Sequence, residues 1–418
     1  MSVLPPGCCF DEPVALMPFA AARAAALALV QPTGRTLSVP LASARGQIAA
    51  RPVVAPHSLP PFDQAAMDGY AIRIADLRPP ASTLPVSGTT EAGDEPGRMA
   101  RGTAHRVMTG AALPQGADTV VMLERTWNPD GDRVTFASPP VAGSHIRRAS
   151  EDVRAGDVVI HSGERLGWPQ IALLAGLGID TVIIAAPIHI AVLTTGSELR
   201  SPGEVLAAGA IHDANGPMLA ALLAEASARI SVTTIGDDCA AIARSLEELA
   251  EGADLIVTTA GMSVGARDHV RDAVRAAGGT LGIVKVAMKP GKPVALGRIG
   301  GAVFVGLPGN PQAAACAALA FVRPIIDAMR GQKARSPVMA IAGFATGART
   351  DDRTELVPVR LRIGHGRLVA ERAGAEGSHR LAPMAAADAM AIIEPLRQLE
   401  IGDPVEILPF ERAPAWRE

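Results

Sequence analysis

The stretch from Ile188 to Arg330 alternates apolar runs with helical segments, and no other feature of the chain constrains the fold as strongly. Strands are expected at 188–193, 230–235, 254–259 and 302–305. Helical patterns occupy 215–229, 240–251, a segment from about 268, and a long apolar segment beyond 311. Regular alternation of strands with helices predicts a parallel sheet that is covered by helices.

The remainder of the chain shows other sequence patterns. With 418 residues the chain is expected to form roughly two to four domains. Residues 13–30 are rich in alanine and leucine and helical in character. From 36 to about 154, short valine-rich runs alternate with turn residues, and the pattern beyond about 332 is similar; both indicate β structure. Because only 3% of the residues are aromatic, the cores must consist mainly of aliphatic side chains.

Charge and cysteine content exclude several classes of function. The formal net charge of −3 gives no general affinity for nucleic acid or anionic membranes, so anion binding must be local. Cysteines 8, 9, 239 and 316 show neither a Cys-x-x-Cys spacing nor a disulfide framework, which favours a reducing cytoplasm. No signal peptide is expected from the N-terminal residues, and the apolar region 171–193 is interrupted by polar residues and proline, so no membrane span is expected there.

Three of the four lysines lie within one short run, at Lys285, Lys289 and Lys292, whereas arginine supplies nearly all other positive charge. Lys285 and Lys289 would share one face of an extended strand, with Val286 and Met288 directed into a core. Clustered ammonium groups indicate an anion site. The alternative is an edge strand that its charges keep soluble.

Polar, glycine-rich loops follow the expected strands. Ligands of open α/β sheets bind beyond the carboxyl ends of the strands, where such loops meet. Glycine lets backbone amides approach an oxyanion, and hydroxyl groups add donors. The loops are 194–198 (with Thr195 and Ser197), 236–238, 261–268 (with Gly261, Ser263 and Gly265) and 306–311 (with Pro308, Gly309 and Pro311).

The same edge carries the acids Glu198, Asp237, Asp238 and Asp268. Carboxylates beside an anion pocket are explained if Mg²⁺ joins them to phosphate or oxyanion oxygens. The competing interpretation of the pair Asp237–Asp238 is that one member caps the following helix. Asp213 is likewise a candidate cap for the helix that begins near 215.

Several ordered motifs, taken together, resemble the molybdopterin molybdenumtransferase family, the MoeA/gephyrin group. The resemblance spans nearly the whole chain. Its motifs are Pro-Pro-Phe-Asp-Gln-Ala-Ala-Met-Asp-Gly-Tyr-Ala at 60–71, Met-Thr-Gly-Ala at 108–111, Gly-Ala-Asp at 116–118, Glu-Asp at 151–152, Thr-Gly-Ser-Glu-Leu at 195–199, Ser-Val-Gly at 263–265, Lys-Pro-Gly-Lys-Pro at 289–293 and Gly-Leu-Pro-Gly-Asn-Pro at 306–311.

The resemblance implies a multidomain fold of α/β and β type. Four parts are expected: a discontinuous helical domain (1–35 and 154–186), an inserted β domain (36–153), a three-layer α/β molybdopterin-binding domain (187–332) and a C-terminal β-barrel domain (333–418). It also implies a homodimer whose active site combines the α/β and C-terminal domains of one subunit with the β domain of the other. Molybdopterin adenylyltransferase and molybdoenzymes are implied as candidate partners.

The reaction that the resemblance implies is the insertion of molybdenum, from molybdate, into adenylylated molybdopterin with release of AMP and assistance by Mg²⁺. The implied catalytic residues are Asp68, Glu198, Asp237 and Asp268, and the last three are also the implied metal ligands. The implied substrate-binding residues are Thr109, Asp152, Thr195, Ser197, Gly261, Ser263, Gly265, Lys285, Lys289, Lys292, Pro308, Gly309, Pro311 and Ser378. Of the catalytic and substrate-binding residues together, Asp68, Thr109 and Asp152 would come from the partner subunit.

Among the departures of the chain from the family pattern, two bear most directly on ligand binding. Ala260 stands where the family has glycine, and its methyl group restricts the backbone near the ligand. Pro358 lies near a usual arginine, which leaves Arg360 and Arg362 as candidate anion contacts. Two alternatives therefore stay open: a non-catalytic paralogue that acts as chaperone or scaffold, and the adenylyltransferase of the same pathway, against which the additional β domains argue.

Overall fold

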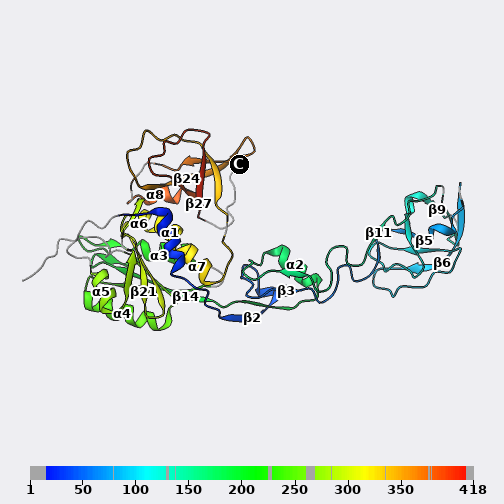
Figure 1. Cartoon of the computed structure of the whole chain (residues 1–418), viewed down its shortest axis with the longest axis horizontal. Coiled ribbons are helices and arrows are strands. Elements are labelled where there is room, and N and C mark those ends of the chain that lie inside the picture. Colours follow the sequence, from blue (N-terminus) through cyan, green and yellow to red (C-terminus); the bar gives the residue numbers. More distant parts are fainter. Residues whose placement is uncertain are drawn as a thin grey trace, which may run out of the picture. The chain divides into compact units, whose positions relative to one another are not determined.

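The structure is a computed structural model, which describes residues 16–78, 80–128, 131–136, 138–224, 228–259, 269–283, 285–334, 336–374, 377 and 379–410. These residues fall into two compact units (Figure 1). Unit 1 takes the described residues of Met1–Leu37, Gly46–Ala50 and Ile184–Glu418, and unit 2 those of Ser38–Arg45 and Arg51–Ile183.

A six-stranded sheet forms the centre of the α/β part of unit 1. Its order is β17-β14-β18-β22-β21-β19, and the first four strands are parallel. These strands are β14 (Ile188–Thr195), β17 (Ala228–Ile235), β18 (Leu255–Thr259), β19 (Thr280–Ile283), β21 (Ala295–Ile299) and β22 (Ala302–Leu307). Helices α1 (Phe19–Ala28), α3 (Asn215–Leu223), α4 (Cys239–Gly252), α5 (Val270–Ala276), α6 (Pro311–Ala317) and α7 (Arg323–Met329) accompany the sheet.

Alternating side chains of β14 supply the cores on the two faces of this sheet. Ile190 and Val192 pack in one core together with Phe321 from the last helix. Ala191 and Leu193 pack in the other core, which α4 and α5 cover. Successive strand residues point to opposite faces, so a strand that is apolar throughout must be covered on both sides. The predicted three-layer arrangement is confirmed.

Helices α6 and α7 are joined by a π-helical segment, η4 (Ala318–Val322), and form one helix from Pro311 to Met329. Of the described helices, this one is long and apolar enough to cross a membrane by length and composition alone, but 78% of its most apolar window is buried inside the protein. It belongs to the core beneath the sheet. Burial of Cys316 in this helix raises the pKa of its thiol, which leaves the side chain as an inert core group.

The C-terminal part of unit 1 is a small barrel. Five strands follow one another in the order β24-β25-β23-β27-β26, and pairing of β24 with β26 closes the circle. They are β23 (Val338–Ala342), β24 (Thr354–Gly364), β25 (Arg367–Arg372), β26 (Ala389–Ile393) and β27 (Pro404–Pro409), with the short helix α8 (Leu381–Ala385) between β25 and β26. Val359, Leu361 and Ile407 lie in its buried core.

The lysine-bearing strand differs from its expected place. The sequence alternation predicts it within the α/β sheet, but β20 (Val286–Lys289) pairs with β24 of the barrel and with β1 (Met17–Pro18). Val286 and Met288 are fully buried, as predicted, in the core beneath the α/β sheet. Strand β20 is therefore held in two ways: one edge pairs with the barrel strand β24, and the face that carries Val286 and Met288 packs against the α/β layer.

Unit 2 contains a six-stranded sheet in the order β8-β5-β7-β6-β10-β9, with an apolar core around Tyr70, Val121 and Phe136. The strands are β5 (Gly69–Ile72), β6 (Ser82–Thr90), β7 (Ala104–Val107), β8 (Thr119–Met122), β9 (Thr126–Trp127) and β10 (Arg133–Phe136).

The remaining described elements of the two units are short: β2 (Thr36–Pro40), β3 (Val53–Val54), β4 (Gln64–Ala65), β11 (Ile146–Arg147), β12 (Val158–Ile160), α2 (Trp168–Gly176), β13 (Thr181–Ala185), β15 (Leu199–Arg200), β16 (Ile211–His212), and the 3-10 turns Leu41–Ser43, Ile74–Asp76 and Leu123–Arg125. The predicted boundaries of the four domains stay predictions.

Candidate functional site

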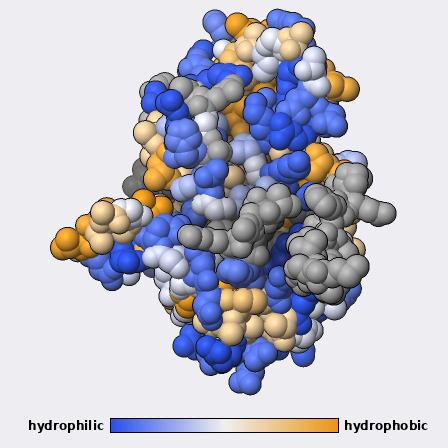
Figure 2. Space-filling model, turned by 90° about the vertical axis from the view of Figure 1, so that its left-hand side faces the viewer, coloured by the Kyte–Doolittle hydropathy of each residue, from blue (hydrophilic) through white to orange (hydrophobic). Residues whose placement is uncertain are grey.

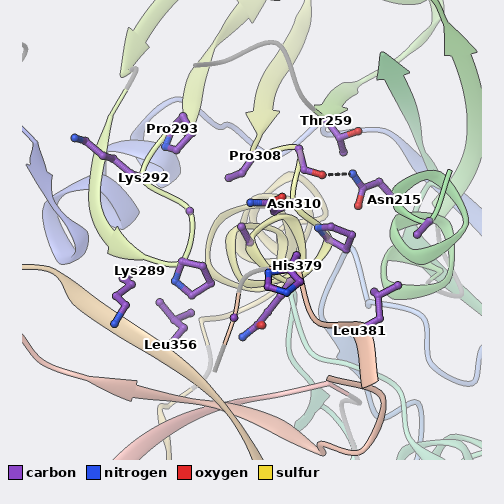
Figure 3. A pocket seen from close by; sticks show the side chains of 18 of the residues that line it. Asn215, Thr259, Lys289, Lys292, Pro293, Pro308, Asn310, Leu356, His379 and Leu381 are labelled. Carbon is purple, nitrogen blue, oxygen red and sulfur yellow. Dashed lines mark hydrogen bonds between the residues drawn. The ribbon is translucent and has the colours of Figure 1, made fainter. Parts of the chain in front are cut away.

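A pocket of about 1080 Å³ opens in unit 1 beyond the carboxyl ends of the parallel strands. Its walls come from the α/β layer and from the barrel (Figure 3). On the face of the molecule seen in Figure 2, hydrophilic residues predominate and hydrophobic ones form small separate groups. The α/β layer supplies Thr195, Glu198, Asn215, Thr259, Pro308, Gly309, Asn310, Pro311 and Gln312, strand β20 and the turn after it supply Lys289 and Lys292, and the barrel part supplies Arg353, Glu355, Leu356, Pro358, His379 and Leu381.

Two of the predicted loops, 194–198 and 306–311, meet at this pocket together with the end of β18. Thr195 ends β14, Thr259 ends β18, and Pro308 follows β22, so strands that lie far apart in sequence bring their ends together. The helix that begins at Pro311 lines the same space with its first turn, and Asn310 makes no side-chain cap there. Uncapped N–H groups and the helix dipole favour an anion at such a position.

The lysine run contributes Lys289 and Lys292 to the pocket lining. Between them Gly291 has a φ of 109°, and a Cβ there would lie 3.2 Å from Met288 Cε and 3.5 Å from Pro308 Cγ. Only glycine suits this conformation and this close approach. Lys285 is half-buried just before β20 and is not among the residues that line the pocket; its role in anion binding stays a prediction.

No sequence pattern indicates the second group of charged residues, which lies at the start of β24 and in the segment before it. Lys289 Nζ lies 3.1 Å from Glu355 Oε1, and Arg349 lies 3.5 Å from Glu355 Oε2. Arg353, which lines the pocket, pairs with Asp351 at 2.6 Å. These residues stand close to Lys289 because β20 and β24 pair with Lys289 opposite Glu355. No local sequence pattern predicts such a long-range register.

Arg353 lowers the pKa of Asp351 to about 2, chiefly through its side-chain hydrogen bonds. A carboxyl whose pKa is depressed on folding stabilises the protein above its unfolded pKa, and this contribution is lost as the pH falls towards the folded value. We therefore expect Asp351→Asn to lower the free energy of unfolding at pH 7, and the difference from wild type to shrink between about pH 4 and pH 2. Urea unfolding of both proteins at several pH values measures this difference in the free energy of unfolding. A difference that does not change with pH would contradict the lowered pKa of Asp351.

Two of the acids have clear structural roles. Asp213 is 4% exposed and accepts hydrogen bonds from the backbone N–H groups of Asn215 and Gly216, at 2.9 and 3.1 Å, so it caps α3 as predicted. Its other oxygen accepts a hydrogen bond from Thr194 Oγ1 at 2.8 Å. Asp238 caps α4 by accepting from the Ala241 N–H at 2.7 Å. The cap interpretation is thus confirmed for one member of the pair Asp237–Asp238.

Asp237 and Glu198 lie beside Ser197. The Ser197 N–H donates to Asp237 Oδ2 and the Asp237 N–H donates to Ser197 Oγ, each at 3.1 Å, so the two loops are tied together. Glu198 lines the pocket, and its carboxylate closely covers Gly196, where a Cβ would lie 2.9 Å from Oε1. Among the described residues no group of three or more His, Cys, Asp or Glu side chains is arranged for a metal ion.

One carboxamide in the pocket wall has an oxygen without a hydrogen-bond partner among the described residues. Asn215 donates from Nδ2 to the Gly309 carbonyl at 2.7 Å, whereas its buried Oδ1 accepts nothing (Figure 3). Gln312, which is 5% exposed, lines the same wall. An unpaired buried polar group costs about 1–3 kcal/mol. Such groups in a pocket are suited to a polar ligand.

In unit 2, Asp68 and Thr109 lie together. The Thr109 backbone N–H donates to Asp68 Oδ1 at 2.7 Å, and its hydroxyl donates to the same oxygen at 2.8 Å. These two hydrogen bonds, the backbone one first, hold the pKa of Asp68 below its usual value. The carboxylate is exposed, as is Asp152. The motif that contains Asp68 thus presents an ionised acid on the surface of unit 2.

The two candidate arginines of the barrel do not line the pocket: Arg360 donates to the Ala386 carbonyl, and Arg362 pairs with Glu371 at 2.6 Å. Pro358 does line it, and Arg353 is the barrel arginine among the described lining residues. Gly261, Ser263, Gly265, Asp268 and Ser378, together with Ala260, lie outside the described residues.

Strand-end loops, a lysine-bearing turn and a barrel wall define a multidomain protein whose pocket lies between an α/β layer and a β-barrel. Residues 17–178 match the MoeA N-terminal region (domain I and II), 191–328 a probable molybdopterin binding domain, and 347–410 the MoeA C-terminal region (domain IV). The chain belongs to the molybdopterin molybdenumtransferase family. This membership assigns it an enzymatic role in molybdenum cofactor biosynthesis and does not favour the scaffold alternative.

Individual relatives support the same assignment. Molybdopterin molybdenumtransferase 2 of Mycobacterium tuberculosis is 42% identical over 303 residues, which cover 69% of this chain and 74% of the relative. Molybdopterin molybdenumtransferase of Haemophilus influenzae is 34% identical over 380 residues, covering 88% and 93%. The crystal structure of the MoeA protein from Pyrococcus horikoshii OT3 matches with a TM-score of 0.81 at 27% identity, covering 94% of this chain and 99% of that one.

Proposed function

We propose that the pocket of unit 1 binds adenylylated molybdopterin together with molybdate, and that the protein inserts molybdenum into the dithiolene of the pterin with release of AMP. The observation that carries this proposal is the meeting of Lys289, Lys292 and an uncapped helix N-terminus in one pocket. Molybdate and the phosphates of the ligand carry several negative charges, which this combination neutralises.

The remaining polar groups of the pocket suit the uncharged parts of the ligand. Asn215 Oδ1 is free to accept a hydrogen bond, and the Gln312 carboxamide can both donate and accept. A pterin ring and an adenine ring each present donors and acceptors along an edge. Leu356 and Leu381 supply apolar wall area for a ring face. The pocket therefore offers positive charge, at the lysines, to the phosphates and molybdate, and hydrogen-bonding groups, at Asn215 and Gln312, to the rings.

The acids in and beside the pocket wall are the groups that would hold Mg²⁺ as a metal shared with the substrate. Glu198 and Asp237 are the described candidates, and one or two carboxylates with substrate phosphates are the usual protein contribution to such a site. When bound, Mg²⁺ would offset the charge of the phosphates and polarise the phosphate bond that breaks. Asp237 is already oriented by its reciprocal contacts with Ser197, and no covalent protein nucleophile is assigned.

Release of AMP tests this function directly. Purified protein is incubated with adenylylated molybdopterin and Mg²⁺, with and without molybdate, and AMP is measured by chromatography. We expect AMP only when molybdate is present, and the Asp237→Ala variant is expected to abolish its release. Tight binding of the adenylylated ligand without any turnover would instead support a carrier role and would overturn the proposal.

A homodimer with shared sites is the second part of the proposal. Asp68, Thr109 and Asp152 would act in the pocket of the partner subunit, and the surface position of the ionised Asp68 is compatible with this role. We expect Asp68→Asn and Lys289→Gln to inactivate the homodimers separately. A heterodimer with one variant in each subunit retains one intact site, and we expect about half of the wild-type activity.

Differently tagged subunits allow this heterodimer to be purified and assayed for AMP release. The control is a heterodimer in which both substitutions lie in the same subunit. If each site is built within a single subunit, the first heterodimer is inactive and the control retains about half of the activity. Light scattering establishes the oligomeric state of every sample.

A further inference from the structure

Glu355 is a buried carboxylate in the wall of the pocket, directly beside the lysine assigned to anion binding. The residue is 8% exposed and lines the pocket, and β20–β24 pairing places it opposite Lys289. Its Oε1 lies 3.1 Å from Lys289 Nζ. The positive charge of Lys289 is therefore already neutralised in the ligand-free protein, so an incoming anion must compete with Glu355.

The other side of Glu355 is held by a fixed arginine. Arg349 lies 3.5 Å from Glu355 Oε2, and its side chain is 8% exposed. The Arg349 guanidinium donates to the backbone carbonyls of Arg353 at 3.1 Å and Glu394 at 3.1 Å, which anchors it to the barrel. Glu355 consequently keeps one positive neighbour even when Lys289 moves away.

The two partners of Glu355 differ in mobility. The Lys289 side chain is 46% exposed, whereas that of Arg349 is 8% exposed. A lysine ammonium is a compact charge with three donors on a flexible stem, so it can change partner by rotating its own side chain. Leaving a buried carboxylate without any cation would be costly, and Arg349 offsets that cost. Lys289 is thus the partner that can leave.

We propose that Glu355 is an exchangeable counter-ion: Lys289 pairs with Glu355 in the ligand-free protein and transfers to an oxyanion of the ligand on binding. Glu355 thereby positions Lys289 at the pocket wall and weakens anion binding enough for release. The inference rests on the proposed function only in assigning an anion to Lys289; it requires an oxyanion ligand but no molybdenum insertion.

Calorimetric titration of the full chain with molybdate alone tests the exchange. Glu355→Gln removes the competing charge and keeps the shape, so we expect the Kd for molybdate to fall about three- to tenfold. In a Lys289→Gln background the same substitution is expected to leave the Kd unchanged, because no lysine remains to be released. Glu371→Gln is the matched control, since Glu371 pairs with Arg362 on the barrel outside the described pocket lining.

Glu355→Asp provides a second variant that keeps a negative charge beside Arg349 and withdraws it from Lys289. We expect a smaller fall in Kd, and thermal unfolding confirms that each variant is folded. An unchanged or higher Kd in folded Glu355 variants overturns the exchange, as does equal tightening in the Lys289→Gln background or failure of every variant to bind molybdate. Molybdate binding that follows the expected pattern without AMP release would overturn the proposed reaction and leave the exchange standing.

Discussion

Replacement of Lys289 by glutamine is expected to lower the rate of molybdate-dependent AMP release by about 100-fold or more, with little change in the folded structure. Removal of one preorganised group that stabilises negative charge has effects of this size in enzymes. The Lys289 side chain is 46% exposed, so the substitution leaves no cavity. Glu355 keeps Arg349 as a neighbour, and the cost of losing its lysine partner is therefore limited.

The measurement is the single-turnover rate of AMP release at saturating adenylylated molybdopterin, together with the thermal midpoint of each protein. Lys333→Gln is the matched control, because Lys333 is an exposed lysine outside the described pocket lining. Wild-type rates in Lys289→Gln would remove Lys289 from the site. A large fall in the thermal midpoint would mean that the ion pair with Glu355 serves chiefly to stabilise the fold.

Asp213→Ala is expected to cause the largest loss of stability, about 2–4 kcal/mol in the free energy of unfolding. The substitution removes the cap of α3 and leaves the buried hydroxyl of Thr194 without this acceptor. It also releases the turn that carries Asn215 into the pocket wall, so ligand binding should weaken together with stability.

Urea unfolding measures this loss, and Asp238→Ala serves as its comparison. Asp238 also caps a helix, but it is exposed, so its removal is expected to cost about 1 kcal/mol. The amount by which Asp213→Ala lowers the free energy of unfolding more than Asp238→Ala does is the contribution of the buried contact with Thr194. Equal losses in the two variants would show that capping alone accounts for the effect. Asp213→Asn, which retains an acceptor oxygen, should recover part of the loss.

Elements that depend on local pattern could be predicted from the sequence. The apolar strands at β14, β18 and β22 are continuous hydrophobic runs, and such runs are typical of strands buried on both faces. The caps Asp213 and Asp238 precede helices at the positions where carboxylates are favoured. The meeting of the strand-end loops followed from the topology, because parallel strands end at one edge of the sheet.

Features that depend on long-range register could not be predicted. Glu355 and Arg353 reach the pocket only because β20 leaves the α/β layer and pairs with the barrel. Gln312 resembles any polar residue in a first helical turn until the burial around it is known. The unpaired oxygen of Asn215 likewise becomes evident only when every neighbour has been placed.

The crossing of β20 into the barrel sheet also limits how this protein can be divided. A fragment that ends before the barrel would lose the β24 partner of β20, exposing unpaired main-chain groups next to Val286 and Met288. A fragment that contains the barrel alone would lack the strand that extends its sheet. Strand β20 therefore joins the two layers, because its main chain pairs with the barrel and its side chains pack in the α/β core. Neither layer can be exchanged for an unrelated domain without changing the pocket that β20 lines.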